Sequence, residues 1–248
     1  MKTDHNNSMQ RAAGTWLCAT ALDNLGGDVE KASEDDWTCE PFLNGQRVTS
    51  FVNLHVSIVA RLGLQNKVVA SQWEAFDPRF FALRAHGAGF IAVLREPFER
   101  MCSWMHYARP KYTLDDLAGF VLRRRDNPMV RMFARSAVAR NNVTRDHLIE
   151  AQSVLERFDK VALQEDLARG HFGANPWHWR LNLTDRVNER PNTATAGVPS
   201  CRERLLRTSP AQVADVDAHL VWDRQLYAYA SELVRARDAR CARAGERV

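Results

Sequence analysis

The chain lacks several features that would place it in a class at once. None of its apolar runs reaches the roughly 18 residues of a membrane-spanning helix, so the sequence predicts no transmembrane segment. The first ten residues, MKTDHNNSMQ, contain no apolar core, which is not the pattern of a secretory signal peptide. Internal repeats and low-complexity linkers are missing as well. At 248 residues, we expect one globular domain over 1–248.

Paired cysteines and strong net charge are missing too. The five cysteines lie far apart with no CxxC motif, which argues against a metal site and allows one or two disulfides. A formal net charge of +4 suits an anionic ligand but is far below that of a dedicated nucleic-acid-binding protein, so we expect no nucleic-acid partner. Sequons at Asn6, Asn142 and Asn182 slightly favour a secretory compartment.

What is present is an alternation of short apolar runs with amphipathic segments. The apolar, β-branched runs predict strands at 66–71, at 89–94 (fully buried) and from 159, the last leading into a turn or helix by 167. Helical periodicity and capping signals predict helices at 14–27, 77–87, from 97, 113–125, 127–137, 144–158 and 209–241. Segment 50–63 fits a strand or a helix, and 170–200 fits a surface loop. This order predicts an α/β fold in which a central parallel sheet is flanked by helices.

The stretch FIAVLREPFERMCSWMHY contains one candidate site. Its apolar run ends at Arg95, and Pro97 suits the first position of a helix. Amides at a helix N-terminus attract anions, and a guanidinium suits phosphate or sulfate. Ser103 lies roughly 9 Å further along the helix, so one phosphate can contact both Arg95 and Ser103. The alternative is that Arg95 pairs with Glu99 or another surface carboxylate while Ser103 faces solvent.

The segment MQRAAGTWLC, at 9–18, is a second candidate site. Its small Ala-Ala-Gly run lets a ligand approach the backbone, Thr15 suits a helix cap, and Arg11 supplies positive charge. The G-x-x-x-x-G-K-[ST] spacing of a Walker A loop is absent, which argues against a nucleotide kinase.

Together these segments resemble the Golgi-type carbohydrate sulfotransferases, which transfer sulfate from 3′-phosphoadenosine 5′-phosphosulfate (PAPS) to a sugar hydroxyl. Residues 95–103, REPFERMCS, match that family's R-[DE]-P-x-x-R-x-x-S element at every constrained position, and RAAGT is similar to its K-[TA]-[GA]-G-T loop. The resemblance implies that Arg95 and Ser103 hold the 3′-phosphate and that the 11–16 loop holds the 5′-phosphosulfate. The loop residues are Arg11, Ala12, Ala13, Gly14, Thr15 and Trp16.

Weaker similarities extend over residues 9–237. DNPMVRMF and LIEAQSVLERFDKVALQEDL are similar to the family segments N-x-x-x-R-x-L and A-x-x-x-L-x-x-F-D-x-V-x-x-x-E. VNERPN and DRQLYAYASEL are similar to its late Asn-containing loop and its terminal D-x-x-L-Y-x-x-A helix. The resemblance implies a three-layer P-loop-like fold, PAPS as co-substrate without a metal, and a carbohydrate acceptor. It also implies a Golgi location, with any membrane anchor outside this sequence.

The chain departs from the family pattern in its catalytic residues. Arg11 replaces the loop lysine, so it can stabilise charge on the leaving phosphate but cannot donate a proton. The polar HNNSM before it predicts a truncated first strand. Gln72 occupies the region of the general base and cannot accept a proton, which leaves Glu74, His106 and His55 as candidates, with solvated surface groups as the alternative.

Two further features leave the function open. Trp177 and Trp179 suit stacking on a sugar ring or adenine, or filling space under a loop. Arg186 and Arg190 suit an anionic acceptor, the cofactor or plain solvation. The sequence therefore predicts a PAPS-dependent sulfotransferase with Arg11, Glu74 and His106 as catalytic candidates. The alternative is a non-catalytic relative that binds a nucleotide or glycan, which the replaced lysine and the missing base favour.

Overall fold

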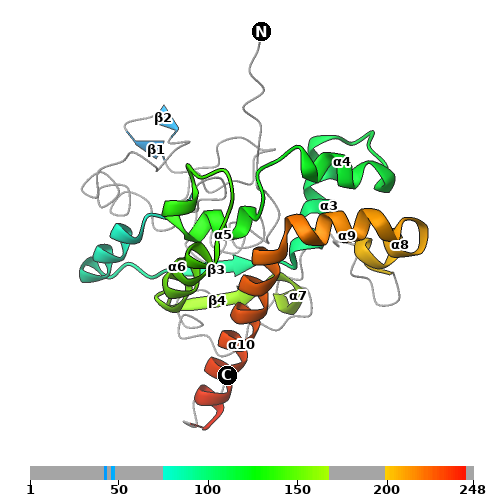
Figure 1. Ribbon diagram of the computed structural model, residues 1–248. Helices are drawn as coiled ribbons and strands as arrows, with labels where there is room; N and C mark the ends of the chain where they lie inside the picture. The colour runs from blue at the N-terminus through cyan, green and yellow to red at the C-terminus, as the bar shows by residue number, and fades with distance from the viewer. Residues whose placement is uncertain (1–41, 44–45, 48–74, 168–198, 244–248) are drawn as a thin grey trace.

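The computed structural model describes residues 42–43, 46–47, 75–167 and 199–243. Figure 1 shows the arrangement of the elements, in which η denotes a 3-10 helix. In chain order they are β1 (Phe42–Leu43), β2 (Gln46–Arg47), η1 (Pro78–His86), β3 (Ile91–Leu94), α3 (Pro97–Ala108), η2 (Leu114–Asp116), α4 (Leu117–Leu122), α5 (Pro128–Phe133), η3 (Arg135–Ala137), α6 (Arg145–Glu156), β4 (Lys160–Leu163), α7 (Gln164–Leu167), α8 (Cys201–Thr208), α9 (Pro210–His219) and α10 (Val221–Arg243). Among these, no helix is both long and apolar enough to cross a membrane.

Strands β3 and β4 form a parallel pair with Ile91 opposite Lys160 and Leu94 opposite Leu163. The predicted strand from 159 and the helical turn after it are confirmed by β4 and α7. The prediction of a fully buried strand at 89–94 is wrong in detail, because β3 begins at Ile91 and alternate residues face a less crowded side. The predicted strand at 66–71 lies outside the described residues, so the three-layer P-loop-like fold stays a prediction.

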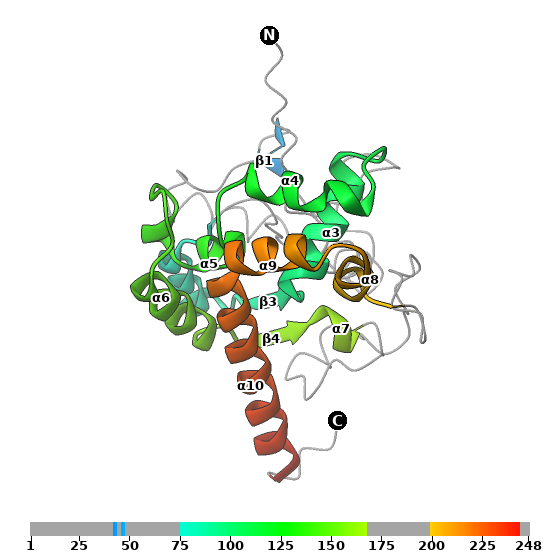
Figure 2. The same ribbon diagram turned by 45° about the vertical axis from the view of Figure 1, so that its right-hand side comes forward.

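Apolar side chains form two clusters that meet where β3 passes into α3. The first surrounds the parallel pair and includes Leu94, Leu155, Val161 and Leu226, with α5, α6 and α10 packed around it. The second includes Phe98, Met105, Leu117, Leu205 and Val216 from α3, α4, α8 and α9. Figure 2 shows α8 and α9 beside α3, while α10 runs past the strands. A disulfide between Cys102 and Cys201 ties α3 to α8.

Local capping signals are confirmed at both ends of η1. The Asp77 carboxylate accepts a hydrogen bond of 3.0 Å from the Arg79 amide, and Pro78 occupies the first helical position. Gly87 ends the helix with φ of 82°, which glycine adopts without steric cost. The segment winds as a 3-10 helix, a geometry that aligns residues three apart, here the buried Phe80 and Leu83.

The helical region predicted at 209–241 is broken into α9 and α10 by the side chain of Asn127. Its Oδ1 accepts hydrogen bonds from the amides of Trp222 (2.8 Å) and Asp223 (3.1 Å). The Asn127 amide donates to the His219 carbonyl at 3.3 Å. Asn127 thus supplies the partners that a continuous helix would have provided, and its φ of 46° is one that asparagine tolerates.

Asp223 makes the reciprocal contact with α5. Its buried carboxylate accepts hydrogen bonds from the amides of Met129 (2.9 Å) and Val130 (2.7 Å), which begin that helix. Burial raises the pKa of Asp223 to about 6, and the two backbone hydrogen bonds oppose this shift. Each of the two helices therefore begins on a side chain supplied by the other.

We expect Asp223→Ala to lower the free energy of unfolding by about 3 kcal/mol, because two buried amides lose their acceptor. Urea unfolding measures this loss. The matched control is Asp215→Ala, an exposed position on α9, where we expect a change within about 0.5 kcal/mol. Equal losses in both variants would contradict the reciprocal cap.

Candidate functional site

The candidate site lies at the carboxyl edge of the parallel pair, where open α/β sheets bind their ligands. Arg95 follows β3 directly and is 9% exposed. Because Leu94 pairs with Leu163, Gln164 follows β4 at the same edge, and it too is buried. Gln164 Oε1 has no hydrogen-bond partner within the described part of the chain. The edge therefore presents one buried cation and one buried acceptor.

The first turn of α3 is capped by the chain's own carboxylates. Glu96 accepts a hydrogen bond from the Glu99 amide at 2.8 Å, so this amide is not open to a ligand as the sequence suggested. The Glu96 amide in turn donates to Glu165 Oε1 at 2.9 Å. The Tyr227 hydroxyl donates a hydrogen bond of 2.7 Å to Glu165 Oε2. Neither the Glu96 amide nor the Glu99 amide is therefore open to an anion at this junction.

The charge of this cap depends on pH near neutrality. Burial raises the pKa of Glu96 to about 7, and the carboxylates of Glu99 and Glu165 add to the shift while the hydrogen bond from the Glu99 amide opposes it. Burial also raises the pKa of Tyr227, and Glu165 adds to that shift. Glu96 consequently takes up its proton at a much higher pH than an ordinary glutamate, which limits the negative charge next to Arg95.

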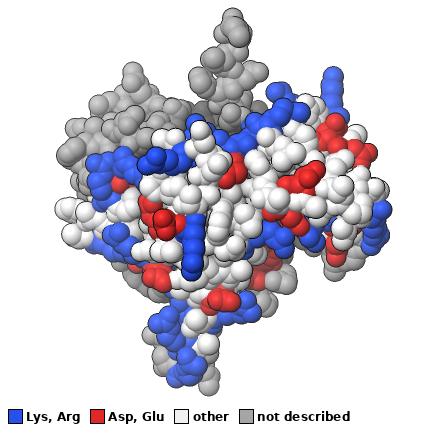
Figure 3. Space-filling model, in the orientation of Figure 1, with Lys and Arg blue, Asp and Glu red and all other residues white. Residues whose placement is uncertain are grey.

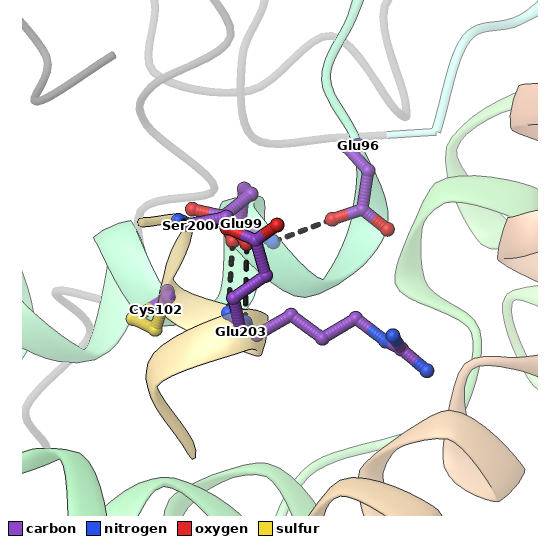
Figure 4. The surroundings of a disulfide bond; sticks show 7 residues. Glu96, Glu99, Cys102, Ser200 and Glu203 are labelled. Carbon is purple, nitrogen blue, oxygen red and sulfur yellow. Dashed lines mark hydrogen bonds between the residues drawn. A yellow bond between two sulfur atoms is a disulfide. The ribbon is translucent and has the colours of Figure 1, made fainter. Parts of the chain in front are cut away.

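Helix α8 begins against the first turn of α3. Glu99 Oε1 accepts a hydrogen bond of 3.1 Å from the Arg202 amide. Ser200 caps α8, because its hydroxyl accepts from the Glu203 amide at 3.1 Å and Glu203 accepts from the Ser200 amide at 2.8 Å. Figure 4 shows these two helix starts side by side next to Cys102 of the disulfide. The disulfide and the Glu99 contact together fix the position of α3.

Arg100, the second arginine of the REPFERMCS motif, is buried behind the junction. Its Nη2 lies 3.0 Å from Met132 Sδ. Burial lowers the pKa of Arg100, Asp223 opposes the shift, and the charge of Arg95 adds to it. Both the Arg95 charge and the Asp223 carboxylate therefore act on Arg100. The motif supplies two buried cations, Arg95 at the edge of the sheet and Arg100 in the first turns of α3.

The other predicted residues of α3 lie further along the helix. Ser103 is half-buried, and His106 is exposed in the last turn. Their spacing from Glu99 puts all three on one stripe of the helix surface. The loop from Arg11 to Trp16 and the candidate base Glu74 lie outside the described residues. His55, Gln72, Trp177, Trp179, Arg186 and Arg190 lie outside them as well.

Segments that resembled the family only weakly meet around this site. Asn127 of DNPMVRMF accepts a hydrogen bond from the amide of Asp223 in DRQLYAYASEL, and the Asp223 carboxylate accepts one from the Met129 amide. Glu165, the last constrained residue of the 148–167 segment, accepts the Tyr227 hydroxyl. Tyr227 belongs to the D-x-x-L-Y pattern, so its position was readable from the sequence. No sequence signal indicated Gln164, because its position beside Arg95 follows only from the register of β3 and β4.

Comparison of the chain with protein-family models, with curated proteins and with solved structures finds no match. Over residues 75–167 and 199–243, no group of three or more His, Cys, Asp or Glu side chains is placed to hold a metal ion. The function is therefore argued from the β3–α3 junction itself.

We expect Glu96→Gln to change the pH dependence of stability. The folded pKa of Glu96, about 7, lies above its ordinary value of 4.5, so its contribution is most favourable below pH 4.5 and is lost as the pH rises to 7. Glutamine does not ionise, so the stability of the variant relative to the wild type should rise by about 3 kcal/mol across this range.

Urea unfolding at pH 4.5, 6 and 7.5 measures this difference. The control is Glu232→Gln on α10, an exposed carboxylate, whose stability should run parallel to that of the wild type. Parallel curves for Glu96→Gln would show that Glu96 ionises normally in the folded chain.

Proposed function

We propose that the protein transfers a sulfuryl group from PAPS to a carbohydrate hydroxyl. The observation that carries the proposal is the position of the REPFERMCS motif, which spans the end of β3 and the start of α3 at the carboxyl edge of the parallel pair. Arg95 is buried at that edge and Ser103 is half-buried on α3. In this proposal the two side chains hold the 3′-phosphate of the nucleotide.

The neighbours of Arg95 support a phosphate at this edge. Arg100 adds a second buried cation, and burial raises the pKa of Glu96 to about 7, which limits the opposing negative charge. Gln164 Oε1 is buried at the same edge and accepts no hydrogen bond from the described residues. It can therefore accept one from a donor group of a ligand held by Arg95. The junction thus combines positive charge with a hydrogen-bond acceptor, as a nucleotide requires.

The proposed reaction is an in-line displacement at sulfur. The acceptor hydroxyl oxygen forms a bond to the sulfur of PAPS while the bond from sulfur to the 5′-phosphate oxygen breaks. Glu74 or His106 takes the hydroxyl proton, and Arg11 in the 11–16 loop stabilises the charge that develops on the departing 3′-phosphoadenosine 5′-phosphate. The products are a sugar sulfate ester and that nucleotide.

The disulfide supports a secretory location such as the Golgi lumen. Cys102 and Cys201 are bonded and both are buried, and disulfides of this kind persist in oxidising compartments. Asn142, in the sequon that precedes α6, is exposed and accessible to glycosylation.

The second candidate is a module without activity that keeps the nucleotide pocket and serves to bind a nucleotide or a glycan. Arg11 in place of the loop lysine and Gln72 at the position of the base are the sequence features that favour it. Both candidates require the nucleotide to bind at Arg95 and Ser103, and only the first requires transfer.

We expect 3′-phosphoadenosine 5′-phosphate to bind the wild type, with Ser103→Ala and Arg95→Lys each weakening binding about tenfold or more, because a charge-assisted hydrogen bond to phosphate is lost. Isothermal titration calorimetry measures the affinities. Ser153→Ala, at an exposed position in α6, is the matched control and should bind as the wild type does.

Transfer is then tested with sulfur-labelled PAPS and a panel of glycans. Labelled glycan with the wild type, reduced in Arg95→Lys, is the expected result. Nucleotide binding without transfer would favour the silent module, and absence of nucleotide binding by the wild type would overturn both candidates.

A further inference from the structure

A separate cavity lies at the opposite end of β4 from Gln164. Its volume is about 310 Å³, in the range of small-molecule sites. Its wall includes Lys160 and Val161 of β4 and Val234, Arg237, Arg240 and Cys241 of α10. Figure 1 shows the last turns of α10 projecting past β4, and Figure 3 shows Lys and Arg side chains gathered around that projecting end.

Three cationic side chains, those of Lys160, Arg237 and Arg240, line this cavity. The Lys160 side chain is 5% exposed, and its ammonium lies 3.7 Å from Asp238 Oδ1. Burial lowers the pKa of Lys160, and although Asp238 opposes the shift, the charge of Arg237 adds to it. Burial likewise lowers the pKa of Arg237, and the charge of Arg240 adds to that shift. All three cations are part of the wall of this one cavity.

The acid in the same wall, Asp159, is committed elsewhere. Its Oδ2 accepts the Phe90 amide at 2.8 Å, and its Oδ1 accepts from Arg84 Nη2 at 3.0 Å. Arg237 is held in place by donating to the carbonyl oxygens of Phe158 (2.9 Å) and Glu156 (2.8 Å). Arg237 is thus fixed in position. The carboxylate in the described wall, Asp159, is directed to other donors, while Asp238 beside Lys160 is not part of that wall.

Part of the cavity wall is apolar. Val161 and Val234 are both buried members of the first apolar cluster and both line the cavity. Apolar surface bordered by a few fixed cations is the chemistry that recognises an organic anion, since the body of the ligand buries apolar area while its head pairs with the cations.

We propose that this cavity binds a small organic anion with an apolar or aromatic body and a carboxylate, sulfonate or phosphate head. Lys160, Arg237 and Arg240 bind the head, and Val161 and Val234 contact the body. The site is distinct from the Arg95 junction, because the two lie at opposite ends of β4, and it does not depend on the proposed sulfuryl transfer.

Cys241 provides a reporter for this cavity, because its half-buried free thiol is part of the wall. The probes are two aromatic disulfides, the dianionic 5,5′-dithiobis(2-nitrobenzoate) and the neutral 4,4′-dithiodipyridine. In either reaction the Cys241 thiolate, its proton lost to buffer, attacks one reagent sulfur. A mixed disulfide forms, and the other half leaves as a thiolate or thiopyridone that absorbance detects. Cys241→Ser identifies the phase that belongs to this residue.

The quantity compared is the rate with the anionic reagent divided by the rate with the neutral reagent. This rate ratio should be higher at Cys241 than for a free cysteine in solution. Arg240→Gln and Lys160→Met should each lower that rate ratio by about threefold to tenfold, because each removes a cation from the wall. The matched control is Arg235→Gln, which removes an equal charge from an exposed position on the same helix and should leave the ratio within about twofold.

Protection of the thiol tests binding itself. The fluorescent aromatic sulfonate 8-anilinonaphthalene-1-sulfonate should slow the neutral reagent at Cys241 with a saturable concentration dependence in the wild type and in Arg235→Gln, and not in Lys160→Met or Arg240→Gln. The proposal is overturned if the rate ratio is the same in all four proteins or if the sulfonate gives no protection in the wild type. The exposed Arg240 keeps the test valid if Lys160→Met does not fold.

Discussion

Asn127 and Asp223 each bind the first turn of the other's helix, and the described fold is arranged around this exchange. Asn127 breaks the C-terminal helical region, so that α9 joins the second apolar cluster while α10 joins the first. Asp223 holds the start of α5 over the parallel pair and also lies within range of Arg100 behind the candidate site. Because both clusters meet at the β3–α3 junction, the exchange also positions the residues proposed to hold phosphate.

Local signals in the sequence were sufficient for both ends of η1 and for the start of α3. Asp77, Gly87 and Pro97 act within a few residues of their own position, so a reader of the sequence finds them where the structure has them. The break between α9 and α10 was not predicted, because its cause, Asn127, is 95 residues from its partner amide at Trp222. Gln164 was missed for the same reason, since only the pairing of β3 with β4 brings it beside Arg95.

The sequence predicted the positive charge of the candidate site but not the hydrogen bonds that cap the start of α3. The sequence indicated an arginine at a strand end before a proline, and the structure places Arg95 there, buried. It did not indicate that the Glu96 side chain caps the Glu99 amide, or that Glu165 of α7 binds the Glu96 amide. These contacts depend on tertiary packing. Because of these contacts, the Glu96 and Glu99 amides are occupied. The charge of the junction comes from Arg95, Arg100 and Glu96, whose pKa is raised to about 7.

The place of α10 in the core also determines when the chain can complete its fold during synthesis. This helix is the last described element, yet it contributes Leu226, Ala230 and Val234 to the first apolar cluster and the acceptor for the amides of α5. While this helix is still in the ribosome, the apolar cluster around β3 and β4 is incomplete, and the first amides of α5 lack the Asp223 acceptor. The sheet can therefore be secured only after translation has passed Val234, so a C-terminal truncation that removes α10 is expected to leave the nascent chain dependent on chaperones.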